Sequence, residues 1–206
     1  MAASMGGRVA VVASGSGTNL QALLDDPHVG PHVVVVVSDR ADAFALERAR
    51  ARGVEAVHVD PVATADRDAH DRAVLEVLRA HDVDVVVLAG YMRLVGAPLL
   101  EVYGGRMLNV HPALLPSFPG THSVADALAY GVKVTGVTVH LVDAGMDTGA
   151  IVLQEPIAIE PGDTWDTLEP RVHAVEHRLL PAAVRALLEG RLVVEGRHVR
   201  IVEGSG

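Results

Sequence analysis

Short, nearly continuous apolar runs alternate in the first half of this chain with segments that carry more charge. The runs cover residues 9–14, 32–39, 56–59 and 83–90 and are rich in valine. Runs of this length and β-branched composition are typical of strands buried on both faces of a sheet. The segments between them, residues 19–26, 41–53 and 66–82, predict helices. This alternation predicts an α/β fold, with a Rossmann-like, mostly parallel sheet and helices on both faces.

The second half of the chain has a less regular pattern. Residues 106–110 and 151–159 predict strands, residues 122–131 a short helix that Gly131 ends, and residues 164–189 a long helix capped by Asp163 or Thr164. Residues 133–143 alternate in polarity, which predicts a strand covered on one face only. That alternation places Val137, Val139 and Leu141 on one face and Thr138 and His140 on the other.

The end of the chain predicts a hairpin over residues 191–202 that turns at Glu195 and Gly196. We find no internal repeat and no linker composition anywhere in the sequence. We therefore expect a single domain over residues 1–206, with an N-terminal half of about residues 8–105 and a C-terminal half of about residues 106–206.

Composition narrows the function classes. Half of the 206 residues are apolar and only 3% are aromatic, which predicts a core of aliphatic side chains. The net charge of −9 argues against nucleic acid, and the absence of cysteine excludes thiolate chemistry. Arg8 interrupts the first apolar stretch before it could form a signal peptide, and no run reaches the roughly 20 residues of a membrane span. We expect a cytoplasmic protein without membrane contact.

A glycine loop, "SGSGTN" from Ser14, follows the first predicted strand and opens the first predicted helix. The backbone N–H groups of Gly17, Thr18 and Asn19 would point from a helix N-terminus, where an anion binds readily. A dinucleotide-binding loop is the rival, with Asp39 near the expected distance, but Leu20 stands where that loop needs a small residue. A tight turn without a ligand is an equal alternative for the glycines alone. The added hydroxyl and amide favour a monophosphate.

The segment "NVHPALLPSFPG" from Asn109 holds an asparagine and a histidine on a backbone stiffened by three prolines. On a strand, Asn109 and His111 project from the same face, and Pro112 ends regular pairing there. An amide donor can stabilise an oxyanion and a histidine can move protons, which suits transfer of an acyl group to an amine. Asp147, in "GMDTG", is the candidate that orients the imidazole.

A metal site is a weaker hypothesis. His111 belongs to no cluster with zinc-ligand spacing, and no HExxH motif occurs, so we expect no metal. His122 and His140 could line the same pocket or could be ordinary buried polar residues, and the residues alone do not separate these alternatives.

Four segments together resemble a known family. They are "SGSGTNLQALL" from Ser14, "VVLAGYMRLV" from Val86, "LNVHPALLPSFPG" from Leu108 and "VTVHLVDAGMDTGAIVLQE" from Val137. Over residues 9–188 the chain resembles the phosphoribosylglycinamide formyltransferases, folate-dependent enzymes of purine synthesis. The resemblance implies the formyltransferase fold and transfer of a formyl group from 10-formyltetrahydrofolate to the amine of 5'-phosphoribosylglycinamide (hereafter glycinamide ribonucleotide).

The resemblance also implies roles for individual residues. His111 would be the general acid, Asp147 the carboxylate that favours its charged form, and Asn109 the oxyanion donor. Glycinamide ribonucleotide would contact the glycine loop and one turn of the long helix: Gly17, Thr18, Asn19, His173, Ala174, Val175 and Glu176. The formyl-folate would contact two loops and their neighbours: Arg67, Met92, Arg93, Leu94, Val95, Asn109, His140, Asp143, Ala144, Gly145, Met146 and Asp147. Ser123 and Val124 differ from some relatives, so the resemblance assigns them no role.

Other functions remain as alternatives. Methionyl-tRNA formyltransferases need a further C-terminal domain and formyltetrahydrofolate hydrolases an extra N-terminal domain, and we expect neither here. Leu20 speaks against an NAD(P)-dependent oxidoreductase, and the Asn109-x-His111 pair against a non-catalytic nucleotide-binding module. We expect small-molecule substrates, no nucleic acid, and a monomer or homodimer.

Overall fold

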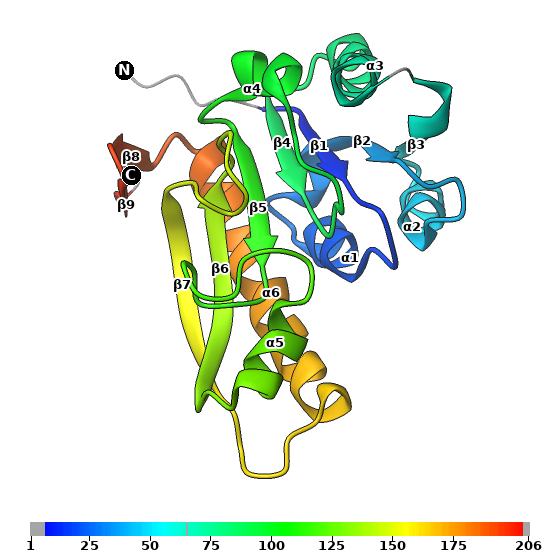
Figure 1. Cartoon of the computed structure of the whole chain (residues 1–206). Coiled ribbons are helices and arrows are strands. Elements are labelled where there is room, and N and C mark those ends of the chain that lie inside the picture. Colours follow the sequence, from blue (N-terminus) through cyan, green and yellow to red (C-terminus); the bar gives the residue numbers. More distant parts are fainter. Residues whose placement is uncertain (1–6, 65, 204–206) are drawn as a thin grey trace.

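In the part of the chain that the structure describes, nine strands form one continuous sheet in the order β3-β2-β1-β4-β5-β6-β7-β9-β8. The computed structural model describes residues 7–64 and 66–203 (Figure 1). The predicted absence of a signal peptide concerns mainly residues 1–6, which lie outside the described residues. Where the structure describes the chain, its helices are too short or too polar to cross a membrane.

The first five strands pair in parallel, as the valine-rich runs predict. They are β1 (Val9–Val12), β2 (Val33–Ser38), β3 (Glu55–His58), β4 (Val85–Leu88) and β5 (Met107–His111). Every residue of β1 and β4 is buried, because helices cover both faces of the sheet here. Such coverage explains why these strands have continuous apolar sequences instead of alternating ones.

Helices pack on the two faces of the sheet in two separate groups (Figure 1). One face is covered by α1 (Thr18–Asp25), α2 (Phe44–Ala51), α5 (Ser123–Tyr130) and α6 (Trp165–Leu188). The opposite face is covered by α3 (Arg67–Ala80) and α4 (Ala97–Tyr103). Two short 3₁₀ turns, η1 (Gly30–His32) and η2 (Pro61–Ala63), lie in the connections. Thr164 is the N-cap of α6, and Gly131 ends α5 with a φ of 81°.

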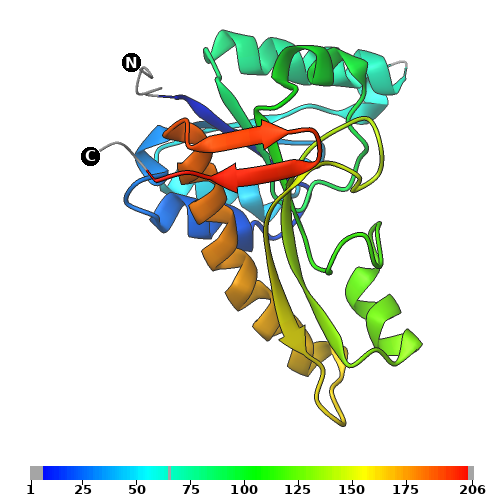
Figure 2. The ribbon, with the colours of Figure 1, turned by 90° about the vertical axis from the view of Figure 1, so that its left-hand side faces the viewer.

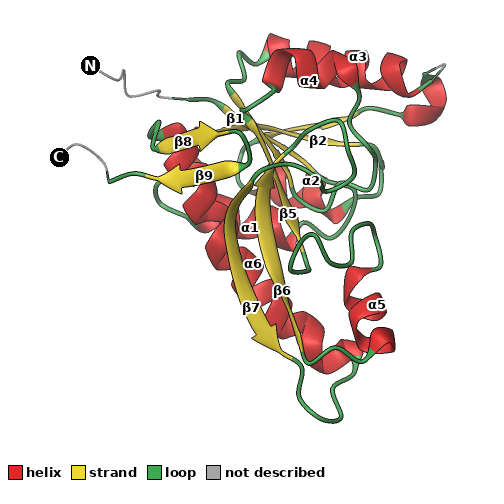
Figure 3. Cartoon of the chain, turned by 60° about the vertical axis from the view of Figure 1, so that its left-hand side comes forward, coloured by secondary structure: helices red, strands yellow, loops and turns green. Residues whose placement is uncertain are grey.

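The second half of the sheet is mixed. β6 (Val134–Leu141) pairs antiparallel with both β5 and β7 (Ile151–Ala158), and the two long strands run beside α6 (Figure 2). The hairpin of β8 (Leu192–Glu195) and β9 (His198–Ile201) completes the edge (Figure 3). Its turn lies at Gly196 and Arg197, one residue later than predicted.

The prediction that β6 has only one covered face is wrong. Residues 135–141 are all buried, and Thr138 and His140, on the supposedly open face, are 0% and 2% exposed. The loop after β5 folds back over this face, and the Thr138 hydroxyl donates a hydrogen bond of 2.7 Å to the carbonyl of Ala113. Thr138 therefore contacts this loop, while His140 contacts Asn109 of β5 and Asp147 of the loop between β6 and β7.

Candidate active site

A cavity of about 370 Å³ opens at the carboxyl ends of β1, β4 and β5. Strand order reverses between β1 and β4, and ligands of open α/β sheets bind at such a point. Most of the predicted site residues line it: Gly17, Thr18, Asn19, Met92, Arg93, Leu94, Val95, Asn109, His111, His140, Asp143, Gly145, Met146, Asp147, His173 and Glu176.

Four predicted residues do not line this cavity. Arg67 and Ala144 line a neighbouring depression beside α4, together with Val95, which borders both. Ala174 and Val175 also lie outside the cavity lining. On a helix, residues three apart share a face, so His173 and Glu176 can reach the cavity while the two residues between them point elsewhere.

Several lining residues were not predicted. They lie beside predicted ones, at strand ends and in loops: Gly15, Ser16, Leu88, Ala89, Gly90, Tyr91, Val110, Pro112, Gly120, Thr121, Ser123 and Val142. Side-chain chemistry could not have signalled them, although their position next to the motifs could.

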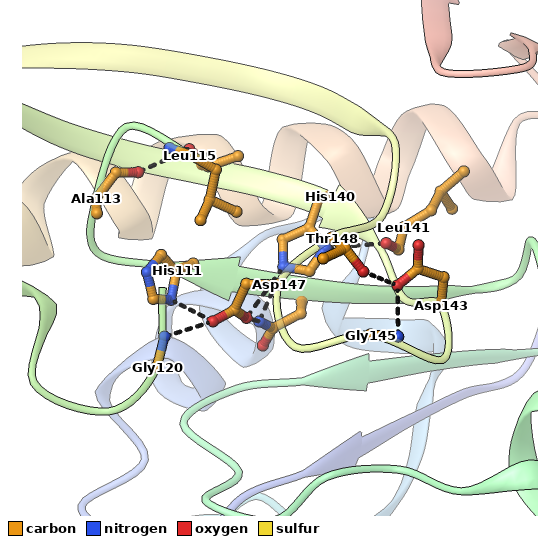
Figure 4. Close-up of polar contacts among 12 residues, drawn as sticks. His111, Ala113, Leu115, Gly120, His140, Leu141, Asp143, Gly145, Asp147 and Thr148 are labelled. Carbon is orange, nitrogen blue, oxygen red and sulfur yellow. Dashed lines mark hydrogen bonds and ion pairs between the residues drawn. The ribbon is translucent and has the colours of Figure 1, made fainter. Parts of the chain in front are cut away.

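Strand β5 carries both Asn109 and His111 to the cavity, and Asp147 lies near both side chains. Figure 4 shows Asp147 beside His111. Asp147 Oδ2 is 3.5 Å from His111 Nδ1, and Asp147 Oδ1 is 3.4 Å from the Asn109 amide nitrogen. The same amide lies 3.1 Å from Nε2 of His140, the residue opposite Asn109 in the β5–β6 register. An amide, two imidazoles and a carboxylate thus meet within one cluster.

A tight loop between β6 and β7 presents Asp147 to this cluster. The carboxylate of Asp143 accepts hydrogen bonds from the Gly145 N–H, at 3.1 Å, and from the Thr148 hydroxyl, at 2.6 Å (Figure 4). At Gly149 a Cβ atom would lie 1.6 Å from the carbonyl oxygen of Leu141, so only glycine fits there. Asp143 therefore uses its carboxylate to shape the loop that carries Asp147.

Burial and hydrogen bonds act on Asp147 in opposite directions. Burial alone, the largest single effect, raises its pKa, but hydrogen bonds from His140 and from the backbone of Gly120 lower it. The nearby His111 lowers it further, and the net pKa of Asp147 is below its usual value. The Gly120 N–H donates at 2.8 Å to Asp147 Oδ2. The geometry favours a charged carboxylate beside the histidine.

Both ring nitrogens of His111 face oxygen acceptors. Nε2 lies 2.8 Å from the carbonyl of Phe118, and Nδ1 faces Asp147. Each ring nitrogen thus has an oxygen partner to which an N–H group could donate. The ring itself is only 4% exposed.

The proline-rich loop is held from beneath by polar side chains of β6 and β7. The Leu115 N–H donates to the Thr138 hydroxyl at 3.2 Å, and the Gln154 side-chain amide donates to the Leu115 carbonyl at 2.9 Å. These bonds supply the partners that a loop with three prolines cannot provide for itself. They fix the backbone that carries His111 on one side and Gly120 on the other.

The glycine loop forms the opposite end of the cavity. Gly17, the N-cap of α1, has a φ of 70°, and a Cβ atom there would lie 2.8 Å from Ala45. Both the backbone conformation and the close packing against α2 require glycine. Leu20 is completely buried, so a large core side chain occupies the position at which a dinucleotide-binding loop needs a small residue. Gly17, Thr18 and Asn19, at the start of α1, line the cavity.

Next to the glycine loop, Glu176 joins α6 to α1. Its Oε2 atom accepts a hydrogen bond of 3.0 Å from the Asn19 amide and lies 2.8 Å from His173 Nδ1. The bond to Glu176 raises the pKa of His173, although burial opposes it. Glu176 itself is only 4% exposed. Among the described residues, no group of three or more His, Cys, Asp and Glu side chains has a geometry that could hold a metal ion.

Known proteins resemble the chain throughout its length. The sequence model of the formyl transferase family matches residues 7–184. A phosphoribosylglycinamide formyltransferase of Mycobacterium tuberculosis (strain CDC 1551 / Oshkosh) is 50% identical over 192 residues, which cover 92% of this chain and 89% of the relative. That of Bacillus subtilis (strain 168) is 42% identical over 88% of this chain and 94% of its own length. The crystal structure of glycinamide ribonucleotide transformylase 1 from Symbiobacterium toebii aligns with a TM-score of 0.94 and 53% identity, over 98% of this chain and 96% of that one.

Proposed function

The chain belongs to the formyl transferase family, and from this premise we propose how its cavity transfers a formyl group from 10-formyltetrahydrofolate to the amine of glycinamide ribonucleotide. The protein is a one-carbon transferase of purine biosynthesis. The products are N-formylglycinamide ribonucleotide and tetrahydrofolate.

One observation carries the proposal. One cavity is lined both by Asn109, His111 and Asp147 and by a glycine loop at a helix N-terminus. A substrate with a phosphate at one end and an amine at the other fits this arrangement. The phosphate would accept hydrogen bonds from the backbone of Gly17, Thr18 and Asn19. Glu176, which contacts Asn19 next to the glycine loop, would accept hydrogen bonds from the hydroxyls of the ribose.

The formyl-folate would enter from the side of the two loops that carry exposed apolar residues. Met92, Leu94 and Met146 are 59%, 47% and 50% exposed, and all three line the cavity. Apolar side chains of this size would sandwich a flat heterocycle, and backbone N–H and C=O groups of the same loops would bond to its polar edge. The side-chain role of Arg67 is the least supported, since Arg67 faces the neighbouring depression.

The reaction is a direct transfer through a tetrahedral intermediate. The substrate amine attacks the formyl carbon, a new C–N bond forms, and the carbonyl π electrons move onto the oxygen. Asn109 donates an N–H bond to that oxyanion, and Asp147 stabilises the charged ring of His111. When the bond between the formyl carbon and folate N10 breaks, N10 keeps the electron pair and takes a proton, while the former amine loses one. His111 is the group that carries protons in this exchange.

A turnover assay tests the proposal. Purified protein is mixed with 10-formyltetrahydrofolate, and the release of tetrahydrofolate is followed with and without glycinamide ribonucleotide. We expect release only when both substrates are present. Release without the amine would favour the alternative, a formyltetrahydrofolate hydrolase, and release only with another amine would favour a different folate-dependent formyltransferase.

Further expectations belong with this proposal. The protein would act as a single domain, in the cytoplasm, as a monomer or homodimer, and without a metal. Its N-terminal half would bind the phosphate, and its C-terminal half would bind the folate and carry the reacting groups.

A further inference from the structure

The loop between β4 and α4, residues 89–96, forms the wall of the cavity at the folate end, yet it has no strand or helix to fix it. Its first residues are held by Ser14, whose N–H donates to the Gly90 carbonyl at 3.1 Å and whose hydroxyl accepts from the Met92 N–H at 3.0 Å. The rest of the loop needs other supports, because backbone groups that bind a ligand must be held in position before the ligand arrives.

Two consecutive residues of α3 supply these supports. Nε2 of His70 lies 3.0 Å from the Tyr91 hydroxyl, and Oδ2 of Asp71 accepts a hydrogen bond of 2.5 Å from the Gly96 N–H. The two contacts bracket Met92, Arg93, Leu94 and Val95, which all line the cavity. One turn of a helix therefore holds both ends of the ligand-facing segment.

Both residues are polar groups in an otherwise apolar layer. His70 and Asp71 are each 1% exposed, and they lie among the core residues Val74, Leu75 and Leu78 of the same helix. At Gly96 a Cβ atom would lie 2.9 Å from Asp71 Oδ2, so the loop backbone approaches the carboxylate as closely as glycine allows. A leucine at either position would avoid the free-energy cost of burying a polar group. The hydrogen bonds to the loop offset that cost and give these polar residues a purpose.

We propose that His70 and Asp71 are positioning residues for the formyl-folate: by holding Tyr91 and Gly96, they keep the backbone of residues 92–95 in the geometry that binds the ligand. The inference rests on the proposed function, since it assigns this loop to the folate. Neither side chain lines the cavity, so both act through the loop and not on the ligand.

The test separates a positioning role from general stability. We would measure KM for 10-formyltetrahydrofolate and for glycinamide ribonucleotide, and the Kd for tetrahydrofolate by calorimetry, in Asp71→Ala, Asp71→Asn, His70→Leu and His70→Gln. Loss of a buried hydrogen bond in Asp71→Ala or His70→Leu should raise KM and Kd for the folates about 10-fold and leave KM for the ribonucleotide unchanged. Asparagine and glutamine keep a polar atom near the original one and should restore most of the affinity.

Arg72→Ala is the matched control, because Arg72 is exposed on the same helix and should change neither constant. If Asp71→Ala does not fold, the His70 pair carries the same test. Unchanged folate affinity in a folded Asp71→Ala or His70→Leu, or an equal rise in KM for both substrates, would overturn the inference. Wild-type protein that binds tetrahydrofolate but does not turn over would count against the proposed function and leave the inference standing.

Discussion

The two ends of one cavity carry the same three kinds of side chain, but the contacts among them differ in length. In the substrate trio, Asn19, His173 and Glu176, the two contacts to the carboxylate are 3.0 and 2.8 Å long. In the reaction trio, Asn109, His111 and Asp147, the corresponding contacts to the carboxylate are 3.4 and 3.5 Å. The short bond of Asp147 is to the backbone of Gly120.

Under the proposed function, this difference distinguishes a binding site from a reaction site. Hydrogen bonds of normal length fix the side chains of the substrate trio, so that they present a rigid surface to a ligand. Longer contacts in the reaction trio leave N–H groups that can strengthen their bonds when charge develops on the substrate. Interactions that strengthen only in the transition state are those that accelerate a reaction. The same residue types therefore serve two purposes, according to how tightly they are packed.

The largest expected effect is that of removing the imidazole from the reaction trio. His111→Ala should lower kcat about 1,000-fold, because proton transfer loses its carrier, while the Kd for tetrahydrofolate should change little. Steady-state turnover assays measure kcat, and calorimetry on the same preparation measures the Kd for tetrahydrofolate. A variant that loses folate binding or the native fold along with turnover would assign His111 a structural role instead.

A smaller and different effect is expected in the substrate trio. Glu176→Gln removes a charged acceptor from Asn19 and His173, which should raise KM for glycinamide ribonucleotide about 10-fold and change kcat by less than about 3-fold. Initial rates over a range of ribonucleotide concentrations, with the folate saturating, give both constants. A loss of kcat with unchanged KM would erase the distinction between the two trios.

The smallest expected effect is on the free energy of unfolding, and its pH dependence runs in opposite directions in the two trios. The pKa of His173 is raised above its usual 6.5, so its contribution to stability is present below pH 6.5 and is lost as pH rises through the folded pKa. The pKa of Asp147 is lowered, so its contribution is present above pH 3.8 and is lost as pH falls through the folded pKa.

Urea unfolding at a series of pH values measures these contributions. The stability advantage of wild type over His173→Gln should shrink toward high pH, by about 0.5 kcal/mol or less, because the side chain is partly exposed. The advantage over Asp147→Asn should shrink toward low pH. If both advantages shrank in the same direction, the assigned pairings would be wrong.

The parallel half of the fold could be predicted from the sequence, and the antiparallel half only in outline. The predicted strands at residues 9–14 and 83–90 contain β1 and β4, because burial on both faces produces a continuous apolar run that local pattern reveals. The second covered face of β6 could not be predicted. Whether Thr138 meets water or protein depends on the path of the proline loop, which the pattern of β6 does not contain. Helix α4 is short and follows an irregular loop, and no prediction was made for it.

The candidate site divides in the same way. Asn109 and His111 share a strand, so alternation alone brings them to one end of the cavity. The position of Asp147 depends on a loop that is shaped by Asp143 and by glycines at Gly145 and Gly149. The bond between Asn19 and Glu176 spans most of the chain, and neither residue has a local pattern that signals the other. Contacts between residues so far apart in the sequence can be recognised only from the folded structure or from the resemblance to a known family.

The most direct test measures kcat for Asp147→Asn and Glu176→Gln side by side, with both substrates saturating. Each substitution replaces a carboxylate by an amide of nearly the same size and shape, so the charge is removed in both variants and only the trio differs. We predict that Asp147→Asn lowers kcat about 100-fold and changes its pH profile, because the charge that favours the imidazolium is gone, while Glu176→Gln keeps kcat close to that of wild type. Equal losses of kcat, or an Asp147→Asn enzyme with normal turnover, would contradict the assignment of chemistry to one trio and binding to the other.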